Sequence, residues 1–154
     1  MSEANLTFGD RHVGPGRNDI RSMLATLGVT IPAAAAPAAN YVPFMQTGNL
    51  LLTAGQLPLV DGKLDATGLL GRDLDTQAGK NAARLCAINI LAQIKAATGD
   101  LEKIAKLVKI TVFVASTPDF TEQHLVANGA SDFLAEALGE RGKHARSAVG
   151  VAVL

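Results

Sequence analysis

The chain has 154 residues and carries 14 Lys and Arg against 14 Asp and Glu, so its formal net charge is zero. This length suits one domain with a sizeable core and is short for two. The balanced charge gives no net attraction toward nucleic acid or anionic lipid, which argues against a general polyanion binder. Aromatic residues make up only 4% of the chain, so the core must be aliphatic and stacking platforms for RNA are scarce.

Cys86 is the single cysteine, which excludes an intrachain disulfide and a zinc site built from several thiolates. The N-terminus lacks the basic stretch and apolar run of a secretion signal. No segment approaches the ~20 apolar residues that cross a bilayer. We therefore expect a soluble protein of the cytoplasm, where thiols stay reduced.

The first part of the chain reads as an appendage. Ile20–Leu27 spaces its apolar residues as a short helix, with Asn18 or Asp19 as its cap. An alanine- and proline-rich stretch follows, which we expect to be an extended connector. The sequence thus predicts an N-terminal appendage over residues 1–31, with a packing or capping role, and a domain over residues 32–154.

Secondary structure in the main domain is predicted from hydrophobic periodicity and from turn residues. Apolar runs at 41–45 and 50–54 flank a glycine-containing turn, which is typical of a hairpin. The remaining elements are a helix from about 76 to 98, a strand over 107–114, a helix from Pro118-Asp119 to Gly139, and a strand over 147–154.

This order, strand-strand-helix-strand-helix-strand, predicts an α/β (α+β) fold with two helices on one face of a mixed sheet. The other face of the sheet must also be buried away from solvent. A second subunit is the simplest way to bury it, so we expect a homo-oligomer.

Arg146 is the most suggestive candidate for chemistry. A guanidinium at the entrance of an apolar strand offers a planar fork that fits a carboxylate, and it stays charged when partly desolvated. The alternative is a surface arginine that pairs with Glu140 or with a partner chain. The residues alone leave both interpretations open.

Two further positions have open interpretations. Gly55 follows a buried strand, where backbone N–H groups could bind a ligand oxygen or simply form a bulge. Asn128 offers an amide donor and acceptor on a helix, and it could equally be a solvated or interface residue. Gly129, directly after it, suggests tight packing against another backbone.

His12, His124 and His144 show no metal-ligand spacing, so no metal is expected.

Several motifs together resemble one family. Over residues 33–154 the sequence resembles the RidA/YjgF family, on motifs that occur in family order and spacing. The motifs are Ala39–Pro43, Gly48–Pro58, Val112–Val114, Asp119-Phe120 and Ala145–Ser147.

This resemblance implies a chorismate-mutase-like fold and a homotrimer with an inner barrel and clefts between subunits. Members of the family hydrolyse reactive enamines and imines, such as 2-aminoacrylate, to 2-keto acids and ammonia. The reaction needs no cofactor.

The resemblance also implies roles for individual residues. Arg146 matches the arginine that holds the substrate carboxylate while a positioned water attacks the imine carbon. The implied substrate-binding residues are Tyr41, Gly55, Gln56, Asn128 and Ser147.

Three departures from the family pattern concern water activation. Ala54 stands where many active members have serine, and Ala148 where many have cysteine. The family's glutamate that is thought to orient the water has no match in this sequence. The departures motivate a second hypothesis, a non-catalytic trimer that binds a small carboxylate such as a 2-keto acid.

An endoribonuclease, a label often attached to the family, is a third hypothesis. Zero net charge, one tyrosine and no clear His/Lys/Glu catalytic set argue against it. We expect a small carboxylate metabolite as ligand and neither nucleic acid nor a membrane as partner.

Overall fold

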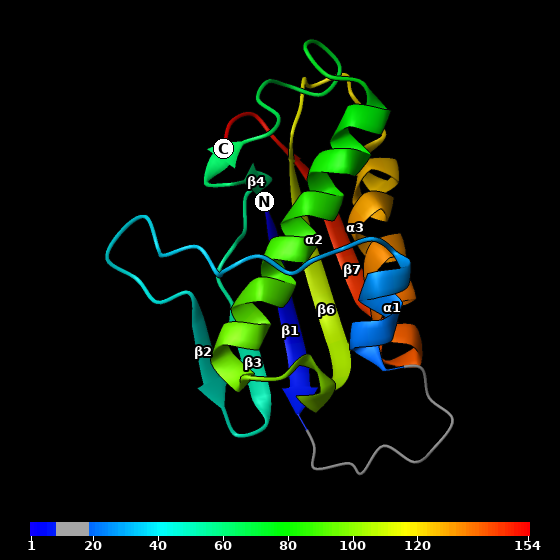
Figure 1. Cartoon of the computed structure of the whole chain (residues 1–154). Coiled ribbons are helices and arrows are strands. Elements are labelled where there is room, and N and C mark those ends of the chain that lie inside the picture. Colours follow the sequence, from blue (N-terminus) through cyan, green and yellow to red (C-terminus); the bar gives the residue numbers. More distant parts are fainter. Residues whose placement is uncertain (9–18) are drawn as a thin grey trace.

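A five-stranded mixed sheet with helices packed on one face makes up the fold in this computed structural model, which describes residues 1–8 and 19–154 (Figure 1). The sheet order is β2-β3-β1-β6-β7, and only the β6–β7 pair is parallel. This arrangement confirms the predicted mixed sheet with α2 and α3 on one face.

The elements have the following bounds. The strands of the sheet are β1 (Ser2–Phe8), β2 (Phe44–Thr47), β3 (Leu50–Thr53), β6 (Ile104–Ala115) and β7 (Ala145–Val151). A separate hairpin pairs β4 (Leu59–Val60) with β5 (Lys63–Leu64). The helices are α1 (Ile20–Thr26), α2 (Thr76–Thr98), α3 (Gln123–Leu138) and the short 3-10 turns η1 (Leu101–Lys103) and η2 (Gly139–Gly142).

The expectation that the first 31 residues form an appendage is wrong for β1. This strand lies in the middle of the sheet, antiparallel to both β3 and β6, with Asn5 opposite Leu52 and Lys109. Ala4 and Leu6 are fully buried beneath the helices. The sequence does alternate apolar and polar residues there, but both partner strands lie far along the chain, so no local signal indicated the pairing. The rest of the boundary at residue 31 stays a prediction.

Helix α1 forms where the periodicity predicted it. The carboxylate of Asp19 accepts a hydrogen bond from the Ser22 backbone N–H at 2.6 Å, which makes Asp19 the N-cap. The other candidate, Asn18, lies outside the described residues. Ile20 and Leu24 are buried in the core, where α1 packs on α3.

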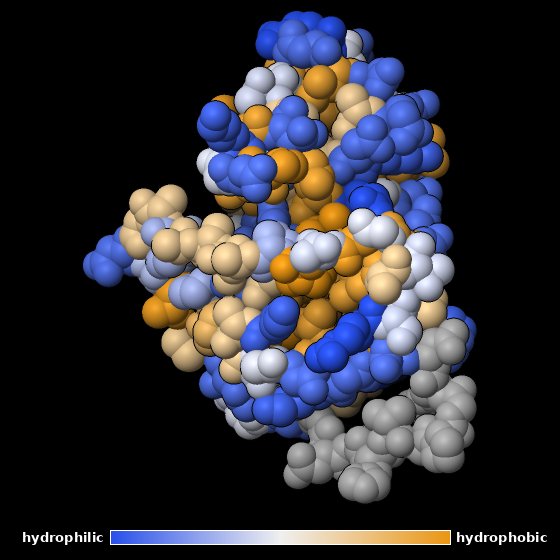
Figure 2. All heavy atoms as spheres, in the orientation of Figure 1, coloured by the Kyte–Doolittle hydropathy of each residue, from blue (hydrophilic) through white to orange (hydrophobic). Residues whose placement is uncertain are grey.

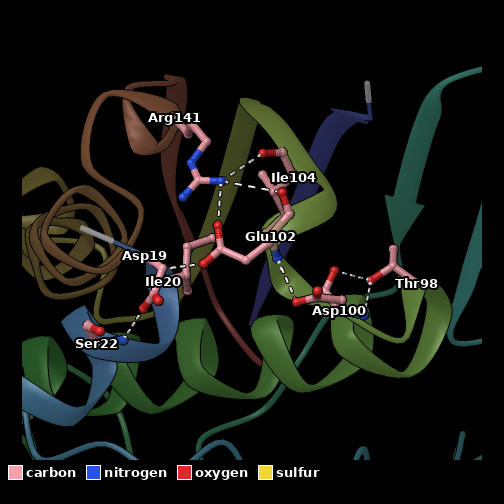
Figure 3. Close-up of polar contacts among 8 residues, drawn as sticks. All are labelled: Asp19, Ile20, Ser22, Thr98, Asp100, Glu102, Ile104 and Arg141. Carbon is pink, nitrogen blue, oxygen red and sulfur yellow. Dashed lines mark hydrogen bonds and ion pairs between the residues drawn. The ribbon is translucent and has the colours of Figure 1, made fainter. Parts of the chain in front are cut away.

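Glu102 in η1 ties α1 to the rest of the molecule (Figure 3). One of its carboxylate oxygens accepts from the backbone N–H of Ile20. The other pairs with Arg141 Nη1 at 3.1 Å, and the two side chains are only 26% and 13% exposed. Arg141 also donates to the Ile104 carbonyl at 3.5 Å. Three segments distant in sequence are thus held by one partly buried ion pair.

The β2–β3 hairpin is confirmed, with a two-residue turn at Gly48 and Asn49. Gly48 has φ 56, the positive value that the first turn position of a type II′ hairpin requires. A second turn joins β4 to β5, and there Asp61 and Gly62 both have positive φ.

The long helix α2 begins and ends as predicted. Asp75 caps it by accepting from Ala78 N at 2.8 Å, and Gly99 ends it with φ 77. The predicted start of α3 at Pro118-Asp119 is wrong, because Phe120 N donates to the Thr117 carbonyl and closes a turn. Helix α3 therefore begins only at Gln123.

The predicted close approach at Gly129 is confirmed. A Cβ at this residue would overlap the carbonyl oxygen of Lys80, so α2 and α3 touch backbone to backbone. Gly79 on α2 is similarly tight, since a Cβ there would lie 2.9 Å from a Val126 methyl. Small residues at the crossing therefore bring α2 and α3 into close contact.

The face of the sheet that carries no helix exposes apolar side chains. Met45, Leu52 and Val149 point away from α2 and α3, with exposed fractions of 57%, 37% and 42%. Within residues 1–8 and 19–154, no helix combines the length and apolar character that crossing a membrane requires.

Candidate functional site

Arg146 and Asn128 meet at the contact between β7 and α3. The Arg146 guanidinium donates from Nη1 to Asn128 Oδ1 at 2.9 Å and to Ser131 Oγ at 3.0 Å. Its Nη2 donates to the backbone carbonyl of His124 at 3.2 Å. All the side chains of this group are partly exposed, so a ligand can reach them.

The helix supplies these groups because of its periodicity. Positions 124, 128 and 131 are spaced i, i+4 and i+7, which places them on one face of α3. Arg146 lies opposite Ile110 in the β6–β7 ladder and so points to the same side of the sheet as α3. The alternative of an Arg146–Glu140 ion pair is wrong, because Glu140 pairs with Lys143 Nζ at 2.7 Å.

Part of the Arg146 guanidinium is free to bind a ligand. Arginine has five N–H donors, and the three bonds above use both hydrogens of Nη1 and one of Nη2. Among the described residues no partner is found for Nε–H and the second Nη2 hydrogen. These two donors lie along the edge that binds a carboxylate bidentately. The contacts with α3 therefore orient Arg146 without using all of its N–H donors.

Ser131 and His144 extend the cluster, and the sequence analysis missed both. Ser131 Oγ lies 3.0 Å from His144 Nε2, and His144 Nδ1 bonds to the Gly142 carbonyl. The available signal was weak. His144 precedes Arg146 by two residues, the spacing that puts side chains on one side of a strand, and Ser131 follows Asn128 by three on a helix.

The other predicted residues lie elsewhere in the chain. Tyr41 precedes β2 and is 49% exposed. Gln56 is only 8% exposed and exchanges two backbone hydrogen bonds with Ser2, at 2.9 and 3.2 Å. Gly55 is adjacent, against the Met1 side chain. Ser147 follows Arg146 but pairs with Thr111 in the ladder, so its side chain is on the opposite face of the sheet.

Tyr41 and Arg146 thus lie far apart in one chain. Tyr41 leads into the edge strand β2, whereas Arg146 is on the opposite edge strand β7, with three strands between (Figure 1). Four strand spacings of ~4.8 Å separate the edges by about 19 Å.

A separate cavity of about 630 Å³ lies between α2, the loop before it and the end of β6. Figure 2 shows apolar atoms gathered in the middle of the face that carries α2, bordered by hydrophilic ones. None of Arg146, Asn128, Ser131 and His144 lines the cavity. Cys86 does, and burial raises the pKa of its thiol to about 11, as expected for a small buried hydrophobe and not for a nucleophile.

A comparison with protein families assigns the chain to a family. Residues 21–154 match the model of the family described as "YjgF/chorismate_mutase-like, putative endoribonuclease". The chain belongs to the YjgF/chorismate mutase-like family. The mixed sheet and its helices match the fold of that family, as the resemblance predicted. Notably, β1 lies outside the matched residues although it occupies the centre of the sheet.

Individual relatives agree with the family. "Protein TCP17" of Trypanosoma cruzi is 49% identical over 143 residues, which cover 92% of this chain and 88% of that protein. The crystal structure of Atu1372, a protein "with unknown function" from Agrobacterium tumefaciens, is 55% identical with a TM-score of 0.81, over 88% of this chain and 82% of that one. A "putative endoribonuclease" from Shewanella oneidensis is 35% identical with a TM-score of 0.86, over 89% and 91%.

Proposed function

We propose that this protein hydrolyses reactive 2-enamine or 2-imino acids of the 2-aminoacrylate kind to 2-keto acids and ammonia. The observation that carries the proposal is the anchored Arg146 guanidinium, whose Nε–H and one Nη2 hydrogen have no partner among the described residues. A carboxylate on that edge would fix the adjacent imine carbon beside α3. Such a reaction needs no metal or redox cofactor.

A homotrimer would complete the cleft. Tyr41 leads into the edge strand β2, Gly55 and Gln56 lie beside the start of β1, and Arg146 is on the β7 edge. A head-to-tail arrangement would bring Tyr41 of one subunit to Arg146 of the next across an interface. Head-to-tail contacts close into a ring when the rotation permits. The exposed apolar residues on the helix-free face support burial of that face in the assembly.

The alternative is a trimer that binds 2-keto acids without turnover. Ala54 and Ala148 favour it, since neither brings a polar side-chain atom to the cleft. Ala148 is half-buried against the hydrophobic core. The endoribonuclease activity named for the Shewanella relative is disfavoured by the zero net charge.

The test couples a serine or threonine dehydratase to this protein and follows release of the keto acid. Wild type should accelerate release, and Arg146→Ala should abolish the acceleration. Arg72→Ala is the matched control, because Arg72 is exposed, pairs with Asp73 and takes no part in the hydrogen bonds of the Arg146 group. Equal rates for wild type and Arg146→Ala would refute the deaminase. A thermal shift with 2-ketobutyrate in the absence of any acceleration would support the binding protein instead.

A further inference from the structure

We propose that the cavity between α2 and the sheet is a second ligand site, which takes a neutral, mainly aliphatic molecule with one hydroxyl or carbonyl group. The cavity measures about 630 Å³. Small-molecule sites in proteins typically measure roughly 300–1,000 Å³ and are lined mostly by apolar side chains with a few polar groups. None of Arg146, Asn128 and Ser131 lines this cavity. Binding there is therefore separate from the proposed deaminase, and either can hold without the other.

Small residues on the first half of α2 create the cavity. The helix lines it with four such residues, Gly79, Ala82, Ala83 and Cys86. Farther along, the same helix places Ile90, Leu91 and Ile94 in the core, where each is at most 1% exposed. Protein interiors are normally packed as densely as organic crystals, so large side chains are expected wherever a helix covers a sheet. The change from large to small residues along α2 therefore leaves a space of ligand size at one end of the helix.

Ser2 brings a hydroxyl group to this cavity. It lies opposite Val112 in the β1–β6 ladder, so its side chain points to the same side of the sheet as Val112, which is buried beneath the helices. Both residues line the cavity. Ser2 is only 1% exposed, and its Oγ has no hydrogen-bond partner among the described residues. A buried hydroxyl without a partner destabilises a fold, and a ligand that forms a hydrogen bond with it removes that penalty.

The rest of the lining indicates the chemistry of the ligand. The side chains with which α2 and β6 line the cavity carry no oxygen or nitrogen. A buried water needs about two to four polar partners, so these walls favour an aliphatic chain over water. Among the described residues Arg72 is the only charged side chain in the lining, and its guanidinium pairs with Asp73 at 2.9 Å. Because no unpaired charged side chain is available for a carboxylate or an ammonium group, the ligand is neutral, and its polar group bonds to Ser2.

The test measures the binding of 1-octanol, and of toluene as a probe without a polar group, by isothermal titration calorimetry. Wild type should bind both saturably. In Ala82→Leu the larger side chain enters the cavity, so the Kd of both probes should rise about tenfold or more as contacts with the walls are lost. Ala96→Leu is the matched control, because it makes the same change at an exposed position of α2 outside the cavity and should leave both Kd values unchanged. Arg146→Ala should also bind both probes as wild type does.

Ser2→Ala tests the hydroxyl separately from the rest of the cavity. Loss of one hydrogen bond should raise the Kd of 1-octanol about fivefold and leave that of toluene unchanged. The melting temperature of the free variant should equal or exceed that of wild type, because the unpaired buried hydroxyl is removed. A serine with a purely structural role would not combine weaker octanol binding with undiminished stability. Octanoate, which has the same chain length and a charge, should bind wild type about tenfold more weakly than 1-octanol, since burial of an unpaired charge is unfavourable.

Absence of saturable binding of both probes would overturn the site, and so would equal affinities of wild type and Ala82→Leu. Unchanged octanol affinity in Ser2→Ala, or octanoate binding as tight as that of 1-octanol, would overturn the proposed class of ligand. None of these outcomes bears on keto-acid release at Arg146. If Ala82→Leu proved unfolded by circular dichroism, Ser2→Ala, a smaller change, would decide alone.

Discussion

Gly129 of α3 lies directly against the Lys80 carbonyl of α2, with no space for a side chain between them. Gly129→Ala should therefore push the helices apart and destabilise the protein by about 3 kcal/mol, the upper part of the range for overpacking. Thermal denaturation should show a melting temperature lower by roughly 6–12 °C. Ala135→Ser, on the exposed face of the same helix, should change it little. An unchanged melting temperature for Gly129→Ala would show that the helices are farther apart.

Leu6 tests whether β1 belongs to the core. Its side chain is fully buried, so Leu6→Ala should lower the free energy of unfolding by about 2–5 kcal/mol. Glu3→Ala, at an exposed position of the same strand, is the control and should cost less than about 1 kcal/mol. Urea denaturation of both variants at equal protein concentration measures the difference. If the segment were an appendage, the two variants would be equally stable.

Substitutions at Asn128 test whether this residue orients the Arg146 guanidinium. Asn128→Ala removes the acceptor 2.9 Å from Nη1, and we expect the Kd for 2-ketobutyrate to rise about tenfold because the guanidinium is less fixed. Asn128→Asp should weaken binding further, since a carboxylate there would pair with Arg146 and compete with the ligand. Isothermal titration calorimetry provides both values. Wild-type affinity in the Asp variant would argue that the ligand binds elsewhere.

Substitution of Glu102 tests whether its contacts with Arg141 and Ile20 attach α1 to the rest of the protein. Glu102→Ala would leave Arg141 partly buried without its ion pair and remove the acceptor for Ile20 N, at a cost of about 1–3 kcal/mol. Glu140→Ala is the matched control, because its pair with Lys143 is exposed and should contribute less than about 1 kcal/mol. Chemical denaturation distinguishes them, and equal losses would contradict a structural role for Glu102.

Cys86 should be unreactive in the folded protein. Burial raises the pKa of its thiol from an ordinary 9.0 to about 11, so little thiolate exists at pH 8. Labelling by a thiol reagent should be slow until denaturant is added. The protonated Cys86 thiol contributes to the free energy of unfolding, and this contribution is fully present below pH 9. It is lost between pH 9 and 11, where the thiol ionises in the unfolded state but not in the folded state. Cys86→Ala should remove that part of the alkaline loss of stability, and rapid labelling of the native protein would contradict the burial.

Local chemistry explains which elements could be predicted from sequence. The bounds of α2 follow from the Asp75 cap and from Gly99, and the β2–β3 turn follows from Gly48. Each depends on residues within a few positions of one another. Arg146 could likewise be proposed as a candidate, because its strand is readable from adjacent residues and its role is implied by the family resemblance.

Tertiary structure decided what depends on distant segments. The central place of β1 depends on strands some 50 and 100 residues away along the chain, and its own seven residues carry only a weak alternation. The Ser131–His144 contact joins a helix to a strand entrance, so neither residue has a local signature.

By itself, the sequence determined the family, the mixed sheet and the two main helices, and it singled out Arg146 as a candidate. Only the tertiary structure decided how Arg146 is held by α3 and that Tyr41 lies at the opposite edge of the sheet from it. The physical reason is that caps, turns and periodicity act over a few residues, whereas strand order and helix docking depend on packing between segments distant in sequence.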